Sequence, residues 1–264
     1  MQGLSKEVSA MLIFREIKIF LASIAFLTRI PVPLSVESIA SIQHKTPRYY
    51  PYAGWIIGGI SSAVYIISSL LFSNNISIIF SMMASIFITG AFHEDGLMDF
   101  VDGFGGGYTK DGILRIMKDP RSGSYGVIAV VMILLLKYSL LSEIKSDLIP
   151  FVLIYSHSLS RFFSISLLPW MDYVRIDGKS SFIGGRIKFR HLFFASLGGF
   201  APLLFFQEYE FVLIFPAVVI PVVLFAFYIK NKIGGYTGDC LGALQQVSEV
   251  IIYILFIING TVLF

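Results

Sequence analysis

The sequence predicts an all-α, polytopic helical membrane protein, and three observations lead to this fold class. The 264 residues are 56% hydrophobic and only 14% charged, whereas soluble proteins carry about 25% charged residues. The apolar residues fall in runs that approach the ~20 residues with which a helix crosses a bilayer. Lysines and arginines gather in alternate connections between these runs. We therefore expect one integral membrane domain, residues 1–264, with about seven transmembrane helices plus an N-terminal interfacial or re-entrant helix.

The candidate spans are apolar runs separated by polar connections. They cover residues 52–72, 76–92, 126–141, 148–168, 192–206, 211–229 and 241–264. Several are short, so we expect tilting or local thinning of the bilayer. Helices are the expected structure because only helices and closed barrels satisfy their own backbone polar groups in hydrocarbon. The runs are too uniformly apolar for barrel strands.

The N-terminal apolar stretch, residues 11–28, differs from the other runs because Arg15 and Lys18 interrupt it. A crossing there would place Lys6 and Arg29 on opposite sides of the membrane, against the positive-inside rule. We therefore expect an interfacial or re-entrant helix. No small-residue cleavage site follows it, so we expect no removable signal peptide.

The distribution of basic residues predicts an orientation. Of the 20 lysines and arginines, 17 fall in one set of alternate connections and only Lys145 falls in the other set. Lys137 and Arg161 lie inside predicted spans. The positive-inside rule then places the long polar connections in the cytoplasm and the protein in the cytoplasmic (inner) membrane.

An acidic segment follows the second span and opens residues 93–125, which we expect to form a cytoplasmic catalytic loop. Asp95, Asp99 and Asp102 have the spacing i, i+4, i+7, which places them on one face of a helix. Like charges so arranged repel each other unless a cation neutralises them. Mg²⁺ is bound by such hard oxygen ligands together with substrate phosphates. The alternative is a solvated acidic face.

Glycines and bases follow the carboxylates. Gly105 and Gly106, with Gly107 after them, offer backbone that can approach a phosphate closely. Cations come next at Lys110, Arg115, Lys118 and Arg121. Carboxylates, glycines and bases in one short segment predict a site for a metal-bridged polyphosphate.

Ionisable residues inside the spans suggest a polar interior. Arg161 lies one turn after His157, and an arginine at this depth should face the bundle interior and have a partner. Its planar guanidinium suits a phosphate or a carboxylate. The alternative is a pairing with an acid such as Glu249 that locks two helices together. We expect Lys137, near the end of its span, to snorkel toward the interface.

Three further features of the sequence leave alternatives open. Asp239 follows a glycine-containing turn and is either an N-cap or an additional carboxylate of the site. The basic connection 172–191 contacts either anionic lipid or the phosphates of a nucleotide. Cys240, the single cysteine, is expected to be a buried structural thiol.

The sequence resembles the cobalamin synthase family (adenosylcobinamide-GDP ribazoletransferase) nearly from end to end. The matching motifs are FLTRIPVP at 26–33, YAG to GG at 52–59, HEDGL at 93–97, DGFGGG at 102–107, IMKDPRSGSYG at 116–126, SR at 160–161 and TGDCLGA at 237–243. Two positions depart from the family pattern as we know it. Pro120 stands where a polar residue is expected, and Gln246 stands where an acid is expected, which puts a metal role for the last helix in question.

The resemblance implies a reaction at the cytoplasmic membrane. Adenosylcobinamide-GDP would be joined to α-ribazole or its 5′-phosphate, with release of GMP and a requirement for Mg²⁺. Asp95, Asp99 and Asp102 would hold the metal, with Glu94 as a further ligand or base. Developing negative charge would fall to Lys118, Arg121 and Arg161. We expect Gly105, Gly106, Arg161 and Asp239 to contribute to substrate binding.

Two other function classes compete with this reading. Asp99 to Gly103 reproduces the Asp-x-x-Asp-Gly start of the CDP-alcohol phosphotransferase signature, but the rest of that signature is absent. A transporter would use Arg161 and His157 to line a pathway, yet the polar residues concentrate in one connection, not in broken helices near the midplane. We expect a lipid bilayer and no nucleic acid as partners, and the sequence leaves homo-oligomerisation open.

Overall fold

The computed structural model describes residues 2–175, 187–205 and 214–262. Within these ranges the chain forms helices and no strand, apart from one isolated bridge between Tyr173 and Tyr236. The predicted all-α fold class is therefore confirmed.

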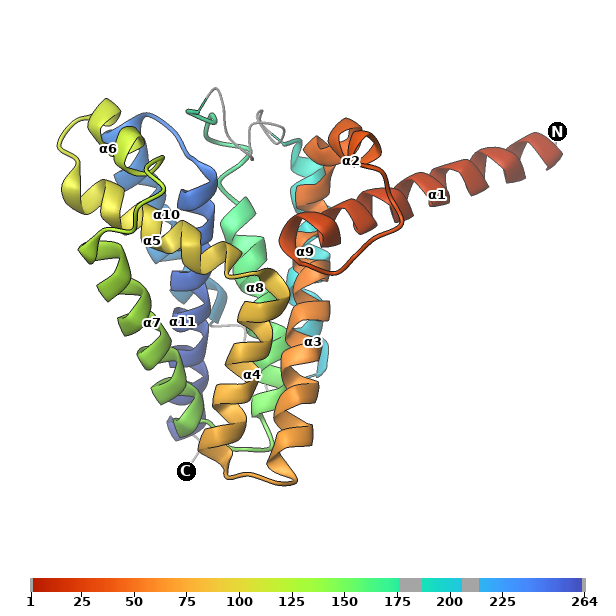
Figure 1. The fold of residues 1–264 in the computed structure, drawn as a ribbon. Coiled ribbons are helices and arrows are strands. Elements are labelled where there is room, and N and C mark those ends of the chain that lie inside the picture. The colour runs from red at the N-terminus through yellow and green to blue at the C-terminus, as the bar shows by residue number, and fades with distance from the viewer. Residues whose placement is uncertain (1, 176–186, 206–213, 263–264) are drawn as a thin grey trace.

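Within the described ranges, seven helices run side by side and form a bundle (Figure 1). They are α3 (Tyr50–Ser69), α4 (Asn74–Thr89), α7 (Ser124–Glu143), α8 (Ile149–Ile165), α9 (Phe189–Phe200), α10 (Ile214–Ile233) and α11 (Gly238–Val262). Each of them lies within or overlaps one of the predicted spans. Short helical segments join them: α2 (Val36–Ile42), η1 (Gln43–Tyr49), α5 (Phe92–Gly106), α6 (Lys110–Ile116) and η3 (Ala201–Phe205).

Three helical segments of the described chain are long and apolar enough to cross a membrane. They are Val36–Ser69, Ser124–Glu143 and Gly238–Ile258. The pair α4 and α5 would make a fourth if it is one broken span. The predicted number of seven spans stays a prediction, because α8 and α9 have only 17 and 12 residues.

The sharp bend between α4 and α5 sets the position of the acidic segment. Gly90 and Ala91 both have left-handed backbone, with φ of +66° and +58°. The Ala91 N–H donates to the Ile86 carbonyl at 2.9 Å and the Gly90 N–H to that of Phe87 at 3.3 Å, a Schellman-type helix end. Left-handed backbone is uncommon for alanine. As a result α5 is bent by 84° from α4 and lies across one end of the bundle (Figure 1).

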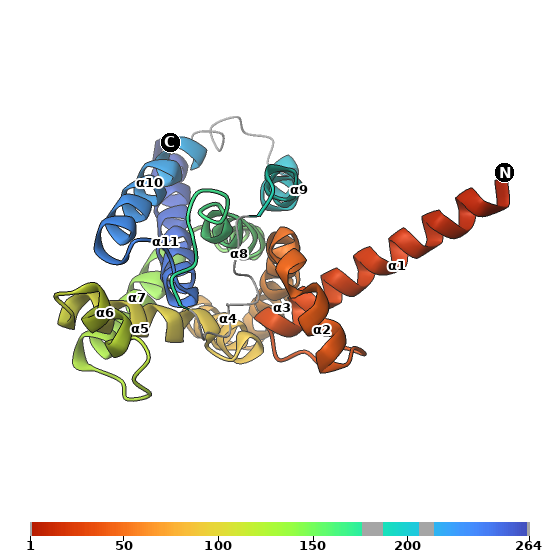
Figure 2. The ribbon, with the colours of Figure 1, turned by 90° about the horizontal axis from the view of Figure 1, so that it is seen from above.

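This end of the bundle, which we call the α5 end, gathers the long connections. η1, α5, α6 and the described part of the connection from α8 to α9 all lie there, as the view from above shows (Figure 2). The predicted catalytic connection 93–125 is mostly helical, because it contains α5 and α6, and its catalytic role stays a prediction. Asp95, Asp99 and Asp102 do lie on a helix, as their spacing predicted.

The N-terminal helix α1 (Gln2–Leu27) projects sideways from the α5 end of the bundle (Figures 1 and 2). It is not among the segments of the described chain that meet the length and apolarity criteria for a span. Its base is fixed by an ion pair of 2.7 Å between Glu16 and Arg48. The direction of α1 agrees with the expected interfacial helix; its place in a membrane stays a prediction.

Glycines let the central helices α3 and α8 approach closely. A methyl group on Gly58 would lie 2.6 Å from the Ile154 Cα, and one on Gly54 would collide with the His157 carbonyl. Small residues at helix interfaces are a common way to bring backbones together in membrane bundles. This packing places the polar face of α8, with His157 and Arg161, in the middle of the bundle.

Candidate active site

A cluster of carboxylates forms where α5 crosses the beginning of α11. Gly96 makes this crossing possible, because a Cβ there would lie 3.3 Å from the Cα atoms of both Asp239 and Gly242. The two backbones are therefore nearly in contact. Asp95, which is exposed, and Asp99, which is half-buried, flank Gly96 on α5. The crossing brings Asp239 into the electrostatic neighbourhood of both.

Arg175 completes this cluster from the connection after α8. Its Nη2 lies 2.7 Å from Oδ2 of Asp239, and the two side chains are only 11% and 19% exposed. Backbone pairing holds the arginine in place. The Val174 N–H donates to the Tyr236 carbonyl and the Tyr236 N–H to the Asp172 carbonyl, both at 3.0 Å. We call Asp95, Asp99, Asp239 and Arg175 the acidic cluster.

The structure decides between the two readings of Asp239. The hydroxyl of Thr237 accepts a hydrogen bond from the Cys240 N–H at 3.3 Å, so Thr237 caps the start of α11. Asp239 is thereby free to face Arg175 and α5. It is an additional carboxylate of the cluster, and the N-cap reading is wrong. Cys240 itself is buried, as expected.

The electrostatics of the acidic cluster favour a bound cation. Burial, together with the nearby carboxylates of Asp239 and Asp95, raises the pKa of Asp99 to about 7, and Arg175 opposes this shift only in part. Three carboxylates face one guanidinium, so negative charge is in excess. A cation placed among these oxygens would relieve the repulsion that the pKa of Asp99 reports.

The donor set fits Mg²⁺ that is shared with a substrate. Among the described residues, no group of three or more His, Cys, Asp or Glu side chains is arranged to hold a metal ion by itself. Mg²⁺ does not need such a cage, because it is usually bound through one or two carboxylates, substrate phosphates and water. The buried Nε of Arg175 has no hydrogen-bond partner among the described residues, so the guanidinium has a spare donor for a phosphate oxygen.

Asp102 has a structural role that its spacing did not predict, and its predicted role as a metal ligand stays a prediction. It is buried, and its carboxylate accepts hydrogen bonds from the N–H groups of Gly123 at 2.7 Å and Gly126 at 2.8 Å. These groups belong to the start of α7, so Asp102 caps that helix from a distance. Side chains on Gly123 or Gly126 would collide with this carboxylate. Asp102 therefore joins α5 to α7.

Glu94 points away from the acidic cluster and into the bundle. Its Oε1 accepts a hydrogen bond of 3.0 Å from Gln246 Nε2, and Gln246 Oε1 accepts one of 2.7 Å from Lys137. Lys137 also lies 3.0 Å from Glu249, and His157 lies 3.6 Å from the same carboxylate. Lys137 is only 5% exposed, so the expectation that it snorkels is wrong. The interior acid Glu249 attracts it inward.

Arg161 belongs to the same interior network. It is 1% exposed, and its Nη1 donates to the carbonyl of His157 at 2.7 Å. It lines a small cavity together with Glu94, His157 and Glu249. This agrees with the expectation that Arg161 faces a polar interior. We call Glu94, Glu249, Lys137, Arg161 and their hydrogen-bonded neighbours the interior network.

The glycines after Asp102 serve packing. Gly105 and Gly106 lie in the last turn of α5, against Tyr125 and Ile116. A helix end of this kind presents carbonyl oxygens and not N–H groups, so the open glycine loop predicted for a phosphate is not formed here. The role of these glycines in binding stays a prediction.

Two of the predicted phosphate-binding bases, Lys118 and Arg121, lie on the connection between α6 and α7. Lys118 is exposed. Arg121 forms a two-point ion pair with Asp119, at 2.9 and 2.7 Å, and this hydrogen bonding lowers the pKa of Asp119 to about 2. In the described part of the chain no ion pair joins either base to the acidic cluster.

Sequence reasoning missed the specific role of Arg175. It appeared there only as one of several bases in the connection 172–191, of which residues 176–186 lie outside the described residues. The pairing with Asp239 depends on the bridge between Tyr173 and Tyr236, two residues that are far apart in the sequence. No local sequence motif predicts the contact between Arg175 and Asp239.

Comparison with known proteins decides the family. The model of the family "Cobalamin-5-phosphate synthase" matches residues 19–257 of this chain. The chain belongs to this family. The match includes the whole acidic cluster, the interior network and the capping residue Asp102, so all of these features lie within the cobalamin-5-phosphate synthase region.

Curated relatives support the same family over most of their length. An adenosylcobinamide-GDP ribazoletransferase of Ralstonia pickettii is 40% identical over 233 residues, covering 87% of this chain and 91% of the relative. The protein of that name from Vibrio cholerae is 38% identical over 246 residues, covering 92% and 94%. One from Shewanella frigidimarina is 39% identical over 251 residues, covering 93% and 96%. No solved structure gives a significant match.

Proposed function

We propose that this cobalamin-5-phosphate synthase family member is an adenosylcobinamide-GDP ribazoletransferase. It transfers the adenosylcobinamide phosphate moiety from adenosylcobinamide-GDP to α-ribazole or α-ribazole 5′-phosphate and releases GMP. The observation that carries the proposal is the acidic cluster, in which Asp95, Asp99 and Asp239 face Arg175 at the crossing of α5 and α11. Carboxylates with one arginine suit a pyrophosphate donor and its cation.

The reaction is a phosphoryl transfer and balances without a further reagent. A ribose hydroxyl of the acceptor attacks the phosphorus attached to cobinamide, and a new P–O bond forms. The P–O bond to the GMP portion breaks, and GMP leaves with the bridging oxygen. Catalysis of this kind depends mainly on positioning and on stabilisation of charge. A carboxylate of the cluster, Asp95 or Asp99, takes the proton of the hydroxyl.

Arg175 and the carboxylates divide the remaining work. Arg175 binds the phosphate oxygens of the donor, and Asp239 orients the guanidinium. Mg²⁺, when bound through Asp95, Asp99 and Asp239, would neutralise the pyrophosphate. We propose that Glu94, inside the bundle, and Asp102, which caps α7, hold α5 in place. The sequence predicted that both residues bind the metal. Lys118 and Arg121 stay candidates for contacts with the substrate.

The membrane arrangement is part of the proposal. We infer that the bundle spans the cytoplasmic membrane and that the α5 end faces the cytoplasm, because the described basic connections lie at that end. GDP-activated substrates would then reach the acidic cluster directly. A single cysteine introduced at exposed Tyr108 in a Cys240→Ser chain should react with a membrane-impermeant maleimide in inverted vesicles and not in intact cells.

The small interior cavities do not favour a transporter. The two cavities that border Glu249 have volumes of about 10 Å³ each, close to the space that one water molecule requires. The capping role of Asp102 also removes support from the CDP-alcohol phosphotransferase reading, because one aspartate of the shared Asp-x-x-Asp-Gly start is engaged by α7.

The direct test is release of GMP. Purified protein in detergent or vesicles would be incubated with adenosylcobinamide-GDP and either acceptor, with and without Mg²⁺, and GMP and the corrinoid product measured by mass spectrometry. We expect equal amounts of both products, only with acceptor and Mg²⁺ present. Absence of GMP with both acceptors, from protein that unfolds cooperatively on heating, would refute the proposed activity.

A further inference from the structure

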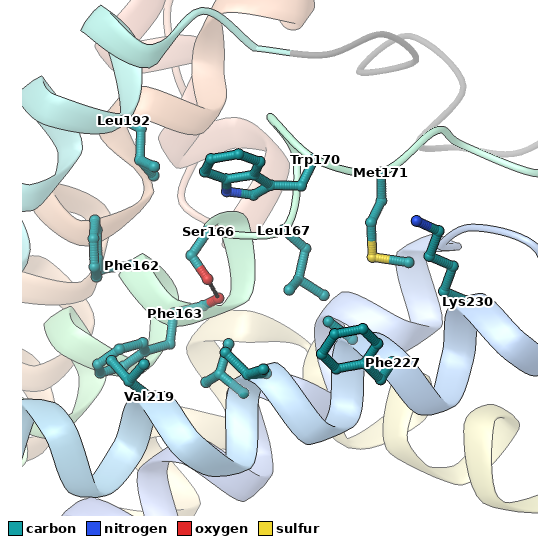
Figure 3. Close-up of a pocket in the computed structure, with 13 residues that line it drawn as sticks. Phe162, Phe163, Ser166, Leu167, Trp170, Met171, Leu192, Val219, Phe227 and Lys230 are labelled. Atoms are coloured by element: carbon teal, nitrogen blue, oxygen red, sulfur yellow. Dashed lines mark hydrogen bonds between the residues drawn. The ribbon is translucent and has the colours of Figure 1, made fainter.

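A large apolar groove lies between α8, α9 and α10 near the α5 end of the bundle (Figure 3). Its volume is about 610 Å³, within the range of about 300 to 1,000 Å³ that is typical of ligand sites. Only two of the residues that line it, Ser166 and Lys230, have a hydroxyl or a charge. The Ser166 hydroxyl donates to the Phe163 carbonyl of its own helix at 2.7 Å. Among the described residues that line the groove, Lys230 therefore offers the charged group to a ligand, and Trp170 adds an indole N–H.

The groove opens on the outer flank of the bundle. Trp170 and Phe227, which line it, are 64% and 61% exposed, and Leu224 and Ile220 extend this apolar surface along α10. In a bilayer this flank would face the acyl chains of lipids and not water. An apolar ligand can thus enter the groove sideways from the membrane.

One end of the groove differs from the rest in its chemistry. Lys230 lies in the last turn of α10, next to Met171 and Phe227, and Trp170 lies farther along the groove between Met171 and Leu192 (Figure 3). A tryptophan and a lysine that line the same apolar groove are typical of the region next to the lipid headgroups. Lys230 makes no ion pair within the described residues. The groove is thus apolar along its length and cationic at its headgroup end.

We propose that this groove binds one anionic phospholipid, with an acyl chain among the apolar side chains of α8 and α10 and the phosphate at Lys230. The positive charge of Lys230 complements the phosphate, and the remaining lining complements a hydrocarbon chain. An anionic headgroup is favoured over a zwitterionic one because a juxtamembrane lysine attracts the net negative charge.

The groove connects to the acidic cluster through a short stretch of chain. Met171 lines the groove, and the residues after it pair with Tyr236 and carry Arg175 to Asp239. A lipid in the groove would steady this stretch and thereby the position of Arg175. This consequence rests on the proposed function, whereas binding of the lipid does not.

The test uses Trp170 as a fluorescent reporter. The chain has two tryptophans, and Trp55→Phe leaves Trp170 alone. Full-length protein would be placed in phosphatidylcholine vesicles that contain increasing fractions of phosphatidylglycerol or phosphatidylcholine with brominated acyl chains, which quench tryptophan. We expect saturable quenching at low fractions of brominated phosphatidylglycerol, with about a fivefold preference over brominated phosphatidylcholine.

Matched variants separate the groove from ordinary annular lipid. Lys230→Gln should reduce the preference to about one, and Ala226→Phe, which fills the groove, should remove the saturable component. Lys232→Gln and Leu224→Phe lie on the same helix but do not line the groove, and both should behave like the parent. Circular dichroism would check that each variant is folded.

Two outcomes would overturn the proposal. One is quenching of the same strength and selectivity in Lys230→Gln and Ala226→Phe as in the parent, which would mean annular lipid only. The other is loss of the saturable quenching on addition of adenosylcobinamide-GDP, which would assign the groove to the substrate. Because fluorescence requires no turnover, failure here is distinguishable from failure of the proposed transferase activity.

Discussion

The acidic cluster and the interior network contain the same kinds of side chain and balance them differently. At the α5 end, Asp95, Asp99 and Asp239 face a single guanidinium, that of Arg175. Inside the bundle, two carboxylates face two bases, and hydrogen bonds from Gln245, Gln246 and Tyr253 complete the arrangement. The acidic cluster therefore has more negative than positive groups, whereas the interior network is close to neutral.

This difference in charge balance suits the acidic cluster to ligand binding and the interior network to support of the fold. A buried group of charges is tolerable when its members neutralise each other, and removing one partner is then costly. The acidic cluster has excess negative charge, which the proposed function neutralises with a cation bound from outside the chain. Glu94 and Asp95 are neighbours in the sequence, yet the first belongs to the network and the second to the cluster. One helix, α5, therefore carries residues of both groups, so the interior network helps to hold the acidic cluster in position.

The largest effect is expected from the cluster itself. Asp99→Asn should lower GMP release by at least about 100-fold, because it removes a carboxylate that we propose to hold Mg²⁺ or to take the proton of the hydroxyl. It should leave the melting temperature unchanged or higher, since it relieves repulsion. Asp111→Asn, an exposed acid on α6, is the control and should retain full activity. Retention of activity by Asp99→Asn would remove it from the site.

Breaking the interior network should affect stability before chemistry. Glu249→Gln or Lys137→Met alone leaves a buried charge unpaired and should cost about 3–5 kcal/mol of unfolding free energy. The double variant should recover a large part of this loss. Denaturant unfolding in mixed micelles, followed by circular dichroism, measures both. Equal stability of the single variants and the parent would show that the network does not support the fold.

The close crossing of α5 and α11 offers an intermediate test. Gly96→Ala introduces a methyl group 3.3 Å from the backbone of Asp239 and Gly242, so the two helices must shift by a few tenths of an ångström. We expect about a tenfold loss in turnover with the fold retained, because catalytic geometry is sensitive to small displacements. Gly59→Ala on α3 meets open space and should be active. Parental turnover by Gly96→Ala would contradict the role given to this crossing.

The smallest effect is expected at Asp102. Asp102→Asn keeps one acceptor for the start of α7 but removes the charge that the helix N-terminus favours, at a cost of about 1 kcal/mol. Thermal unfolding should show this loss, while the Mg²⁺ concentration for half-maximal GMP release stays at the parental value. A large increase in that concentration would restore Asp102 to the metal ligands.

Much of this arrangement can be predicted from local patterns. Apolar runs locate the bundle helices, and the spacing of Asp95 and Asp99 places them on one helical face. Long-range partners cannot be predicted in this way. The spacing of Asp102 is equally regular, and only its contact with α7 shows that it is a cap. The inward direction of Lys137 likewise depends on Glu249, which is distant in the sequence.

The bend after α4 marks a second limit. Gly90 is a familiar helix end, but the left-handed Ala91 that follows it is not predicted by residue type. That pair turns α5 across the bundle and brings Asp95 and Asp99 to Asp239. In an open loop, the backbone N–H groups of Gly105 and Gly106 would be free to bind a phosphate. In α5 these two glycines lie in the last helical turn and do not form such a loop.

The most direct test of the account compares Glu94 with its neighbours on α5. Mn²⁺ can replace Mg²⁺, and electron paramagnetic resonance measures its binding to the protein in the presence of adenosylcobinamide-GDP. We expect Glu94→Gln to retain bound Mn²⁺ and an Asp95→Asn, Asp99→Asn double variant to lose it, while both stay folded. Loss of Mn²⁺ from Glu94→Gln with retention by the double variant would contradict the assignment of the acidic cluster.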